Sequence, residues 1–201
     1  MSTKHRQSVN VAVWGPAGAG REGGRSTVAE QGSAFDGPVV SSAHLAAGAM
    51  PALSEFEFGT ILVSHAFERW MVRCMAAAGV PDLSPVDVLV LHAAHHRDRP
   101  KRMADLCLVL NIEDTHVVSY AVKKLARLGL VATRLQGKEK LVAATPAGAE
   151  ACRRYGEIRE ALLVRSVAAL GLDRAALSTL AAQMRVLSGH YDQAARAAAS
   201  L

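Results

Sequence analysis

The segment from Pro100 to Thr145 constrains the fold of this chain more than any other stretch of its sequence. Its first part, Lys101–Asn111, has the length and apolar spacing of a short helix that ends at Asn111. The apolar pattern predicts a second helix over 113–128, and a glycine follows it. A hairpin is expected over 131–145, because Gly137 permits a tight turn between two short β-prone runs. The segment therefore predicts two helices joined by a short turn and followed by a hairpin.

Helix, turn, helix and hairpin in this order are typical of a winged helix-turn-helix, which places its second helix in the major groove of DNA. In the second predicted helix, Val118, Ala121, Val122 and Leu125 recur on one face, which we expect to be buried. The opposite face and the N-terminal end of the helix are then free to contact base edges. The candidate base-contacting residues are Thr115, His116, Val117, Ser119 and Tyr120.

Basic side chains gather around the same segment. They precede its first helix, end its second helix and flank the hairpin tip, where lysines and arginines typically contact phosphates or the minor groove. A formal net charge of +5 also suits a polyanionic partner, although the arrangement of the charges carries the argument. A solvated charged face with an ordinary surface hairpin is the alternative. The candidate phosphate-contacting residues are Arg99, Lys101, Arg102, Lys123, Lys124, Arg134, Lys138 and Lys140.

Apolar stripes on the flanking helices predict a second contact surface. The capping-box pattern Ser54–Glu57 predicts the start of a helix over 53–79. Further helices are expected over 146–198, where apolar residues follow a 3-4-3-4 spacing typical of helices packed lengthwise. This apolar stripe either belongs to an intramolecular core or packs with the first helix in a two-fold dimer. The dimer is favoured because a small DNA-binding protein usually binds two half-sites, one for each subunit. The predicted dimerisation residues are Val63, Phe67, Trp70, Leu177, Leu180, Met184, Leu187 and Tyr191.

Three motifs give the chain a resemblance to a known family. Leu83–Leu91, Val122–Val131 and Ala144–Gly148 are similar, in order and spacing, to parts of the MarR-type winged-helix regulators, and the likeness extends from about Leu53 to Tyr191. The resemblance implies a mainly α fold with a small β-hairpin wing, a cytoplasmic homodimer, and control of transcription, often repression relieved by a small ligand. One departure is Lys138-Glu139-Lys140, which stands where the family's wing usually carries an Asp-x-Arg pair.

The domain organisation predicted from composition has two parts. Residues 1–50 are rich in Gly, Ala and Ser and show no periodicity, which predicts a flexible tail. Residues 51–201 form the predicted winged-helix domain with its dimerisation helices. No apolar run reaches the length of a membrane span, and three widely spaced cysteines indicate reduced thiols.

Other site chemistries receive less support. His92 and His96 have an i, i+4 spacing that can hold a transition metal, but no matching carboxylate or cysteine lies nearby, so no metal site or cofactor is expected. A redox switch at Cys74 or Cys107 is disfavoured by their apolar faces. A small-molecule effector pocket involving Trp70, Met71 or His92 is the stronger hypothesis. No catalytic constellation is found.

The sequence favours a homodimeric, DNA-binding transcriptional regulator, and a repressor is favoured over an activator. It would read a pseudo-palindromic duplex site through the helix at 113–128 and the wing at 131–145. The alternative is a winged-helix protein-interaction module without sequence-specific DNA binding.

Overall fold

A computed structural model describes residues 37–171 and 173–201 of the chain. The chain divides into two units after Pro38, and every helix and strand of the described residues belongs to the second unit, Val39–Leu201. Most of the predicted tail over 1–50 lies outside the described residues, so its flexibility stays a prediction. Within 39–50, a short helix α1 (Ala43–Ala46) lies against the next helix, and the Ser54 hydroxyl donates to the Leu45 carbonyl over 2.7 Å.

The second unit is mainly helical with one small sheet. Its elements in chain order after α1 are α2 (Pro51–Ala77), α3 (Pro85–His95), the 3-10 turn η1 (His96–Asp98), β1 (Lys101–Arg102), α4 (Met103–Leu110), α5 (Thr115–Arg127), β2 (Val131–Gln136), β3 (Glu139–Ala144), α6 (Pro146–Ile158), the π-helix η2 (Arg159–Val164), α7 (Arg165–Ala169) and α8 (Arg174–Ala198).

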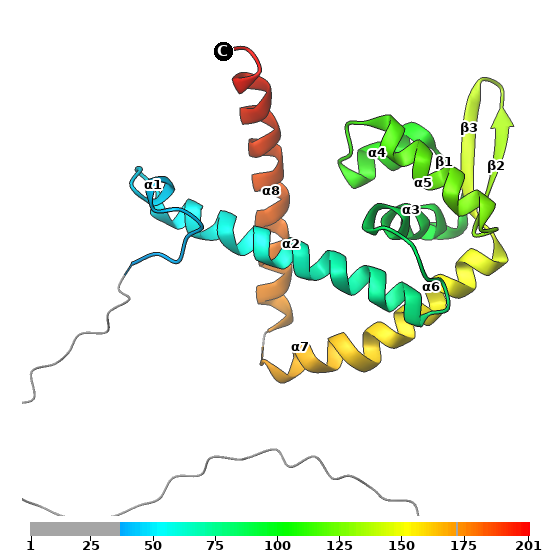
Figure 1. The fold of residues 1–201 in the computed structure, drawn as a ribbon, viewed down its shortest axis with the longest axis horizontal. Helices are drawn as coiled ribbons and strands as arrows, with labels where there is room; N and C mark the ends of the chain where they lie inside the picture. Colours follow the sequence, from blue (N-terminus) through cyan, green and yellow to red (C-terminus); the bar gives the residue numbers. More distant parts are fainter. Residues whose placement is uncertain (1–36, 172) are drawn as a thin grey trace, which may run out of the picture. The chain divides into compact units, whose positions relative to one another are not determined.

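Helix α3 is the centre of the core. It lies between the α4–α5 pair and α2 (Figure 1) and also contacts α6 and β3. Val88, Val90 and Leu91 of α3 are fully buried, and Met75 of α2 and Leu125 of α5 are buried in the same cluster. Side chains from α2, α3 and α5 therefore form one apolar core, which fixes α5 relative to the rest of the unit.

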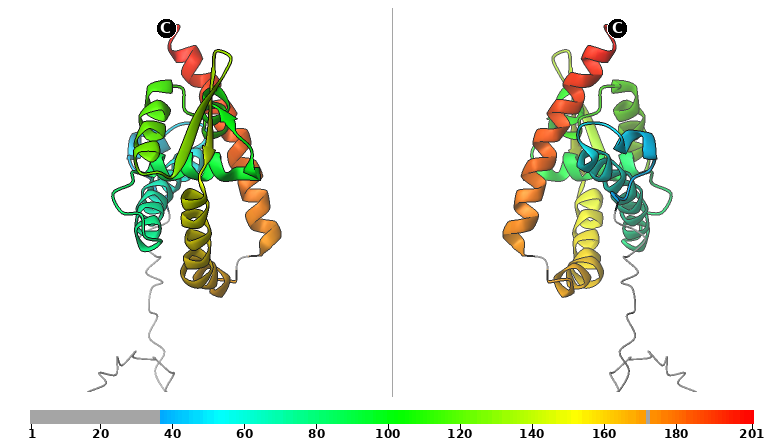
Figure 2. Two further views of the ribbon diagram at one scale, coloured as in Figure 1. Left: turned by 90° about the vertical axis from the view of Figure 1, so that its right-hand side faces the viewer. Right: turned by 90° about the vertical axis from the view of Figure 1, so that its left-hand side faces the viewer.

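The sheet is antiparallel with the strand order β1-β3-β2. Figure 2 shows the β2–β3 hairpin extending away from the start of α6. The expected hairpin is confirmed, and its turn contains Gly137 at a φ of +61°, a left-handed conformation that favours glycine. The expectation that Lys101 and Arg102 open a helix is wrong. They pair with Val142 and Leu141 of β3, so the helix begins two residues later.

Local capping residues mark several helix boundaries, and the predicted end at Asn111 is confirmed. Asn111 ends α4 in a left-handed conformation with a φ of 51°. Ser84 and Asp87 form a reciprocal capping box at the start of α3, and the Thr145 hydroxyl accepts from the Gly148 amide at the start of α6.

The capping box predicted at Ser54–Glu57 is wrong. Helix α2 already begins at Pro51, since a proline fits the first turn of a helix, where its missing N–H has no partner. Ser54 is therefore inside the helix, where its hydroxyl bonds to α1 instead of capping.

The C-terminal region predicted over 146–198 consists of several helical pieces. Helix α6 continues through the π-helix η2 into α7 without a capping break, and the chain then turns at Gly171, which has a φ of +69°. Asp173 precedes α8, and its side chain makes no capping hydrogen bond. Among the residues described, no helix combines the length and apolar character needed to cross a membrane.

Candidate nucleic-acid interface

Helix α5 presents a buried face and an open face. Val118, Ala121, Val122 and Leu125 are buried, as the apolar periodicity predicted. The helix is capped by Asp114, whose carboxylate accepts from the His116 amide over 2.8 Å. The predicted helix of 113–128 is thus confirmed, with bounds shorter by one or two residues at each end.

The predicted base-contacting residues lie on the uncovered side of this helix. Thr115 and His116 are exposed, Ser119 is half-buried, and Val117 is 38% exposed. Tyr120 is 70% exposed, which is unusual for an aromatic side chain without a partner protein. The Lys123 ammonium lies 5.4 Å from the centre of the Tyr120 ring, within the range of a cation–π contact. The open face therefore combines an aromatic ring, hydroxyls and an adjoining cation.

Lys124 does not join that face. Its ammonium forms an ion pair with the Asp87 carboxylate over 2.8 Å and donates to the Asp82 carbonyl. The Asp87 carboxylate also accepts from the Ser84 amide, and its side chain is only 6% exposed. Lys124 thus attaches α5 to the start of α3, and its charge is engaged there instead of being presented to a phosphate.

Two further predicted phosphate contacts, Lys101 and Arg102, are also engaged within the chain. The Lys101 ammonium donates to the carbonyls of His96 and Arg99, and its pKa is lowered, first by desolvation and then by nearby arginines. The Arg102 guanidinium pairs with Asp105 over 3.0 Å and with Glu139 over 3.5 Å. Arg102 thus links the start of α4 to the first residue of β3, beside the hairpin turn, while Lys101 ties down the loop before β1.

The other predicted cations are on the surface. Arg99, Lys123, Arg134 and Lys138 are exposed and make no ion pair with any residue in the described ranges. Lys140 is half-buried, and its register opposite Leu135 places it on the other face of the hairpin from Arg134, which pairs with Leu141. The wing therefore carries cations on both of its faces.

Sequence reasoning missed three residues that shape this interface. Glu139 joins the wing to Arg102, and Asp87 joins α5 to α3. At Gly148, a Cβ atom would lie 2.0 Å from the Leu130 carbonyl oxygen, so only glycine allows α6 to begin beside the strand base. The Ser84–Asp87 spacing was a visible signal, whereas the partners of Glu139 and Gly148 are distant in sequence.

The predicted dimerisation residues lie mostly on open surfaces. Val63 and Phe67 on α2 are at least half exposed, and Trp70 is half-buried. On α8, Leu177, Leu180, Met184 and Tyr191 are exposed, Leu187 is intermediate, and no residue of this helix is buried. Tyr191 donates a hydrogen bond to Glu57 over 2.9 Å.

A cavity of about 650 Å³ lies at the junction of α2, α3 and α6. Met71 and His92, predicted for an effector pocket, line it, whereas Trp70 packs against the neighbouring core. The His92 ring meets the Tyr155 ring edge-on, 4.6 Å between centroids. Burial lowers the pKa of His92, and the adjacent His95 lowers it further, so the ring is neutral near pH 7. Its Nε2 is buried without a hydrogen-bond partner among the described residues.

The cysteines and the remaining histidines offer little reactive chemistry. All three cysteines are free and buried, as expected. Burial raises the pKa of the Cys74 thiol and raises that of Cys152 to about 11, which disfavours the reactive thiolate. Helix α3 ends at His95, so His92 and His96 do not share the continuous helix that an i, i+4 metal site requires. Within 37–171 and 173–201, no three metal-binding side chains are grouped suitably.

Comparison with known proteins agrees with this geometry. A family model described as a winged helix DNA-binding domain matches residues 83–148. No curated protein sequence matches the chain. Among solved structures, NMB1585, a MarR family regulator from Neisseria meningitidis, is 16% identical with a TM-score of 0.58, covering 71% of this chain and 95% of that one.

Two ligand-bound structures are similar to the same extent. CouR from Rhodococcus jostii RHA1, bound to p-coumaroyl-CoA, is 17% identical with a TM-score of 0.56, covering 66% of this chain and 90% of that one. Staphylococcus aureus MarR, in complex with salicylate and kanamycin, is 14% identical with a TM-score of 0.55, covering 71% and 93%. Residues 83–148 thus match a winged helix DNA-binding domain model, and the chain has the fold seen in the MarR family of transcriptional regulators.

Proposed function

We propose that this chain is a homodimeric transcriptional regulator that inserts α5 into the major groove and lays the β2–β3 wing beside it. The open face of α5 carries the proposal, because its polar and aromatic side chains stand free while the opposite side holds the core. An exposed tyrosine next to a lysine has no evident structural role there, whereas base edges and phosphates offer partners for both.

The contacts divide into two groups. Side chains from Thr115 to Tyr120 would meet base edges, since the N-terminal end of a reading helix enters the groove. Arg99, Lys123, Arg134, Lys138 and Lys140 would meet phosphates, or the minor groove at the wing tip. Lys101, Arg102 and Lys124 are left out of the direct contacts, because their charged groups already bind within the chain.

The exposed apolar stripe of α8 supports a homodimer. Its apolar stripe runs through a helix in which no side chain is buried, and α2 exposes Val63 and Phe67. Stripes of this kind are stable in water when a second helix covers them. A second copy would do so and would present two reading helices to a pseudo-palindromic site. A regulator that binds DNA in this way would act in the cytoplasm. Repression follows where such a site overlaps a promoter.

Control by a small molecule is supported by the cavity at His92. It combines aromatic walls, a neutral imidazole with an unpartnered nitrogen, and the guanidinium-bearing Arg159. The ligand-bound structures of CouR and S. aureus MarR share the fold. We propose that an aromatic or apolar effector binds here and changes the affinity for DNA.

Selection of genomic fragments by the purified full-length protein tests the DNA function. We expect enrichment of pseudo-palindromic fragments, and fluorescence anisotropy on the selected duplex should give a Kd that rises at least tenfold in Tyr120→Ala. Arg165→Gln, an exposed change far from the reading helix, is the control and should keep the affinity. Absence of any enriched fragment would favour the protein-interaction module instead.

Light scattering after size exclusion tests the dimer. The wild-type chain should elute with twice the monomer mass at micromolar concentration, and Leu180→Asp should shift it toward the monomer. Ser178→Asp, which adds the same charge off the apolar stripe, should remain dimeric. A wild-type monomer would refute the two-half-site arrangement.

A further inference from the structure

We propose that the groove between α4 and the wing binds an acidic peptide segment of a partner protein, with aliphatic side chains among its carboxylates. This α4–wing groove has a volume of about 1050 Å³ and is lined by the segment 96–102, by α4 and by the strands β2 and β3. Small-molecule sites typically have about 300–1,000 Å³, so the size favours a peptide. No residue of the reading helix α5 lines the groove, and the proposal does not depend on DNA binding.

One wall of the groove is an apolar face of α4. Asp105, Leu108 and Val109 have the i, i+3, i+4 spacing that places residues on one side of a helix. Leu108 is 81% exposed and Val109 is 74% exposed, although the opposite side of α4 is buried in the core. Apart from Asp105, every residue of α4 is apolar, and a helix that is apolar on all sides is normally buried. The outer face of α4 therefore has the character of a contact surface.

The groove also carries cations that lack counter-ions. The guanidinium groups of Arg97, Arg99 and Arg134 are exposed and make no hydrogen bond or ion pair with any residue in the described parts of the chain. The acidic residues that line the groove do not compensate them, because both already pair with Arg102. The groove is therefore positively charged beside an apolar wall.

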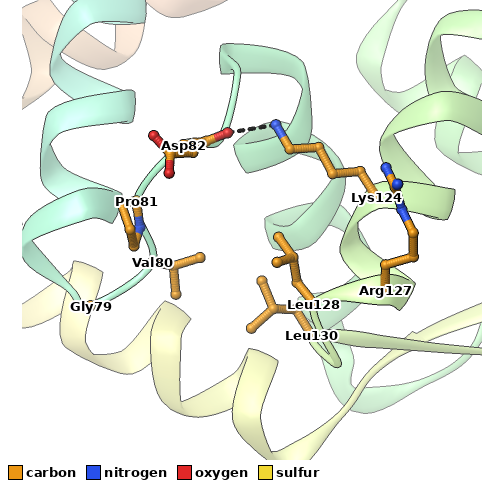
Figure 3. A pocket seen from close by; sticks show the side chains of 8 residues that line it. All are labelled: Gly79, Val80, Pro81, Asp82, Lys124, Arg127, Leu128 and Leu130. Atoms are coloured by element: carbon orange, nitrogen blue, oxygen red, sulfur yellow. Dashed lines mark hydrogen bonds between the residues drawn. The ribbon is translucent and has the colours of Figure 1, made fainter.

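Lys124, at the C-terminal end of α5, shows how the same chain compensates a cation internally. Its ammonium donates to the Asp82 carbonyl (Figure 3) and pairs with the Asp87 carboxylate. No acid of the described residues takes that place for the free guanidinium groups of the α4–wing groove. Carboxylates of a ligand would supply the missing counter-ions.

The backbone that carries Arg97 is held in an unusual conformation. Arg97 has a φ of 60° and Asp98 a φ of 45°, and two consecutive left-handed residues other than glycine are costly. The Lys101 ammonium donates to the carbonyls of His96 and Arg99, which stand on either side of these two residues, and so stabilises the turn. Strained backbone of this kind persists where its surroundings hold it and is common at binding sites. The fold thus fixes the backbone of Arg97 at the groove.

An acidic peptide with aliphatic residues matches both the cations and the apolar wall. Its carboxylates would pair with the guanidinium groups, each of which can bind two oxygens at once. Its leucine, isoleucine or valine side chains would cover Leu108 and Val109 and displace water from them. A DNA backbone would satisfy the cations, but its charged phosphates offer little apolar surface to this wall. The combination therefore favours a peptide over a nucleic acid.

Selection from a phage-displayed library of random dodecapeptides tests the proposal on the full-length protein. We expect the enriched peptides to combine aspartate or glutamate with leucine, isoleucine or valine. The strongest of them, synthesised with a fluorescent label, should bind with a Kd that rises with salt, because ion pairs in an open groove are screened. Enrichment of no peptide, or of peptides without acidic residues, would overturn the proposal.

Two variants test the apolar wall and the free cations separately. Leu108→Ser should raise the Kd of the labelled peptide about tenfold, and Arg97→Gln should raise it by a similar factor. Leu128→Ser and Arg165→Gln, at exposed positions outside the groove, are the matched controls and should keep the wild-type affinity. Since all four side chains are exposed, the fold should be kept, which the midpoint of urea unfolding checks. Wild-type affinity in either Leu108→Ser or Arg97→Gln would overturn the site.

The duplex from the genomic selection separates this groove from the proposed DNA interface. We expect Leu108→Ser to bind that duplex with the wild-type Kd while it loses affinity for the peptide. Equal losses of both ligands would assign the groove to DNA and overturn the proposal. If peptides are enriched and no duplex is bound, the proposed function fails while this inference stands. If the duplex is bound and no peptide is enriched, this inference alone fails.

Discussion

The adjacent lysines of α5 should have opposite mutational phenotypes. Lys123 is exposed beside Tyr120, whereas Lys124 is paired with the buried Asp87. We predict that Lys124→Met reduces the free energy of unfolding while Lys123→Met leaves it unchanged. We also predict that Lys123→Met weakens DNA binding through the loss of a phosphate contact.

The magnitude for Lys124 follows from its burial. Its side chain is 34% exposed and that of Asp87 is 6% exposed, which places the pair between two reference cases. Exposed pairs contribute below about 1 kcal/mol, and removing one partner of a fully buried pair costs about 3–5 kcal/mol. Because Asp87 keeps the Ser84 amide, we expect Lys124→Met to cost about 2 kcal/mol. Lys123→Met should change stability by no more than about 0.5 kcal/mol.

Urea unfolding and salt-dependent anisotropy on the selected duplex measure the two effects. For Lys123→Met, the slope of log Kobs against log salt should fall in magnitude by about 0.9, the value for one phosphate contact. Lys124→Met should keep the wild-type slope, whatever its effect on overall affinity. The assignment is refuted if Lys124→Met is as stable as the wild type and loses one unit of slope.

Three further changes test the frame around the reading helix. Gly148→Ala should cost about 3 kcal/mol in urea unfolding, since its Cβ would lie 2.0 Å from the Leu130 oxygen, while Gly156→Ala on the same helix should cost nothing. The pKa of His92 is about 6.5 in the unfolded chain and lower in the folded chain, so the unfolded chain takes up the proton first as the pH falls. The free energy of unfolding should therefore decrease as the pH drops below about 6.5. His92→Gln should lose less stability than the wild type between pH 7.5 and 5.5, and equal losses would contradict the assignment. Arg102→Gln should weaken the wing's attachment and raise amide exchange in β3, whereas Arg99→Gln should not.

The order of elements and the buried face of α5 could be predicted from the sequence because both depend on local patterns. Apolar residues at helical spacing identify the side that enters the core, and Ser84, Asn111 and Thr145 mark helix ends through their own capping chemistry. Gly137 similarly marks the turn of the hairpin. None of these signals depends on a partner that is distant in the chain.

The errors arose where residues outside the short motif override its pattern. Lys101 and Arg102 continue an acceptable helix in sequence, but β3 offers backbone hydrogen bonds that draw them into a strand. Ser54 and Glu57 match a capping box, yet Pro51 starts the helix earlier and α1 takes the serine hydroxyl.

The different surroundings of Lys123 and Lys124 show what helical periodicity can predict and what it cannot. Each residue of a helix is rotated by about 100° from the one before it, so Lys123 continues the open side that carries Tyr120. Lys124 lies one turn after Ala121, at the edge of the buried face, and an ammonium there is stable when an acid compensates its lost hydration. Position therefore indicates that Lys124 needs an internal partner. Only the structure identifies Asp87, 37 residues earlier, because that pairing depends on how α3 packs against α5.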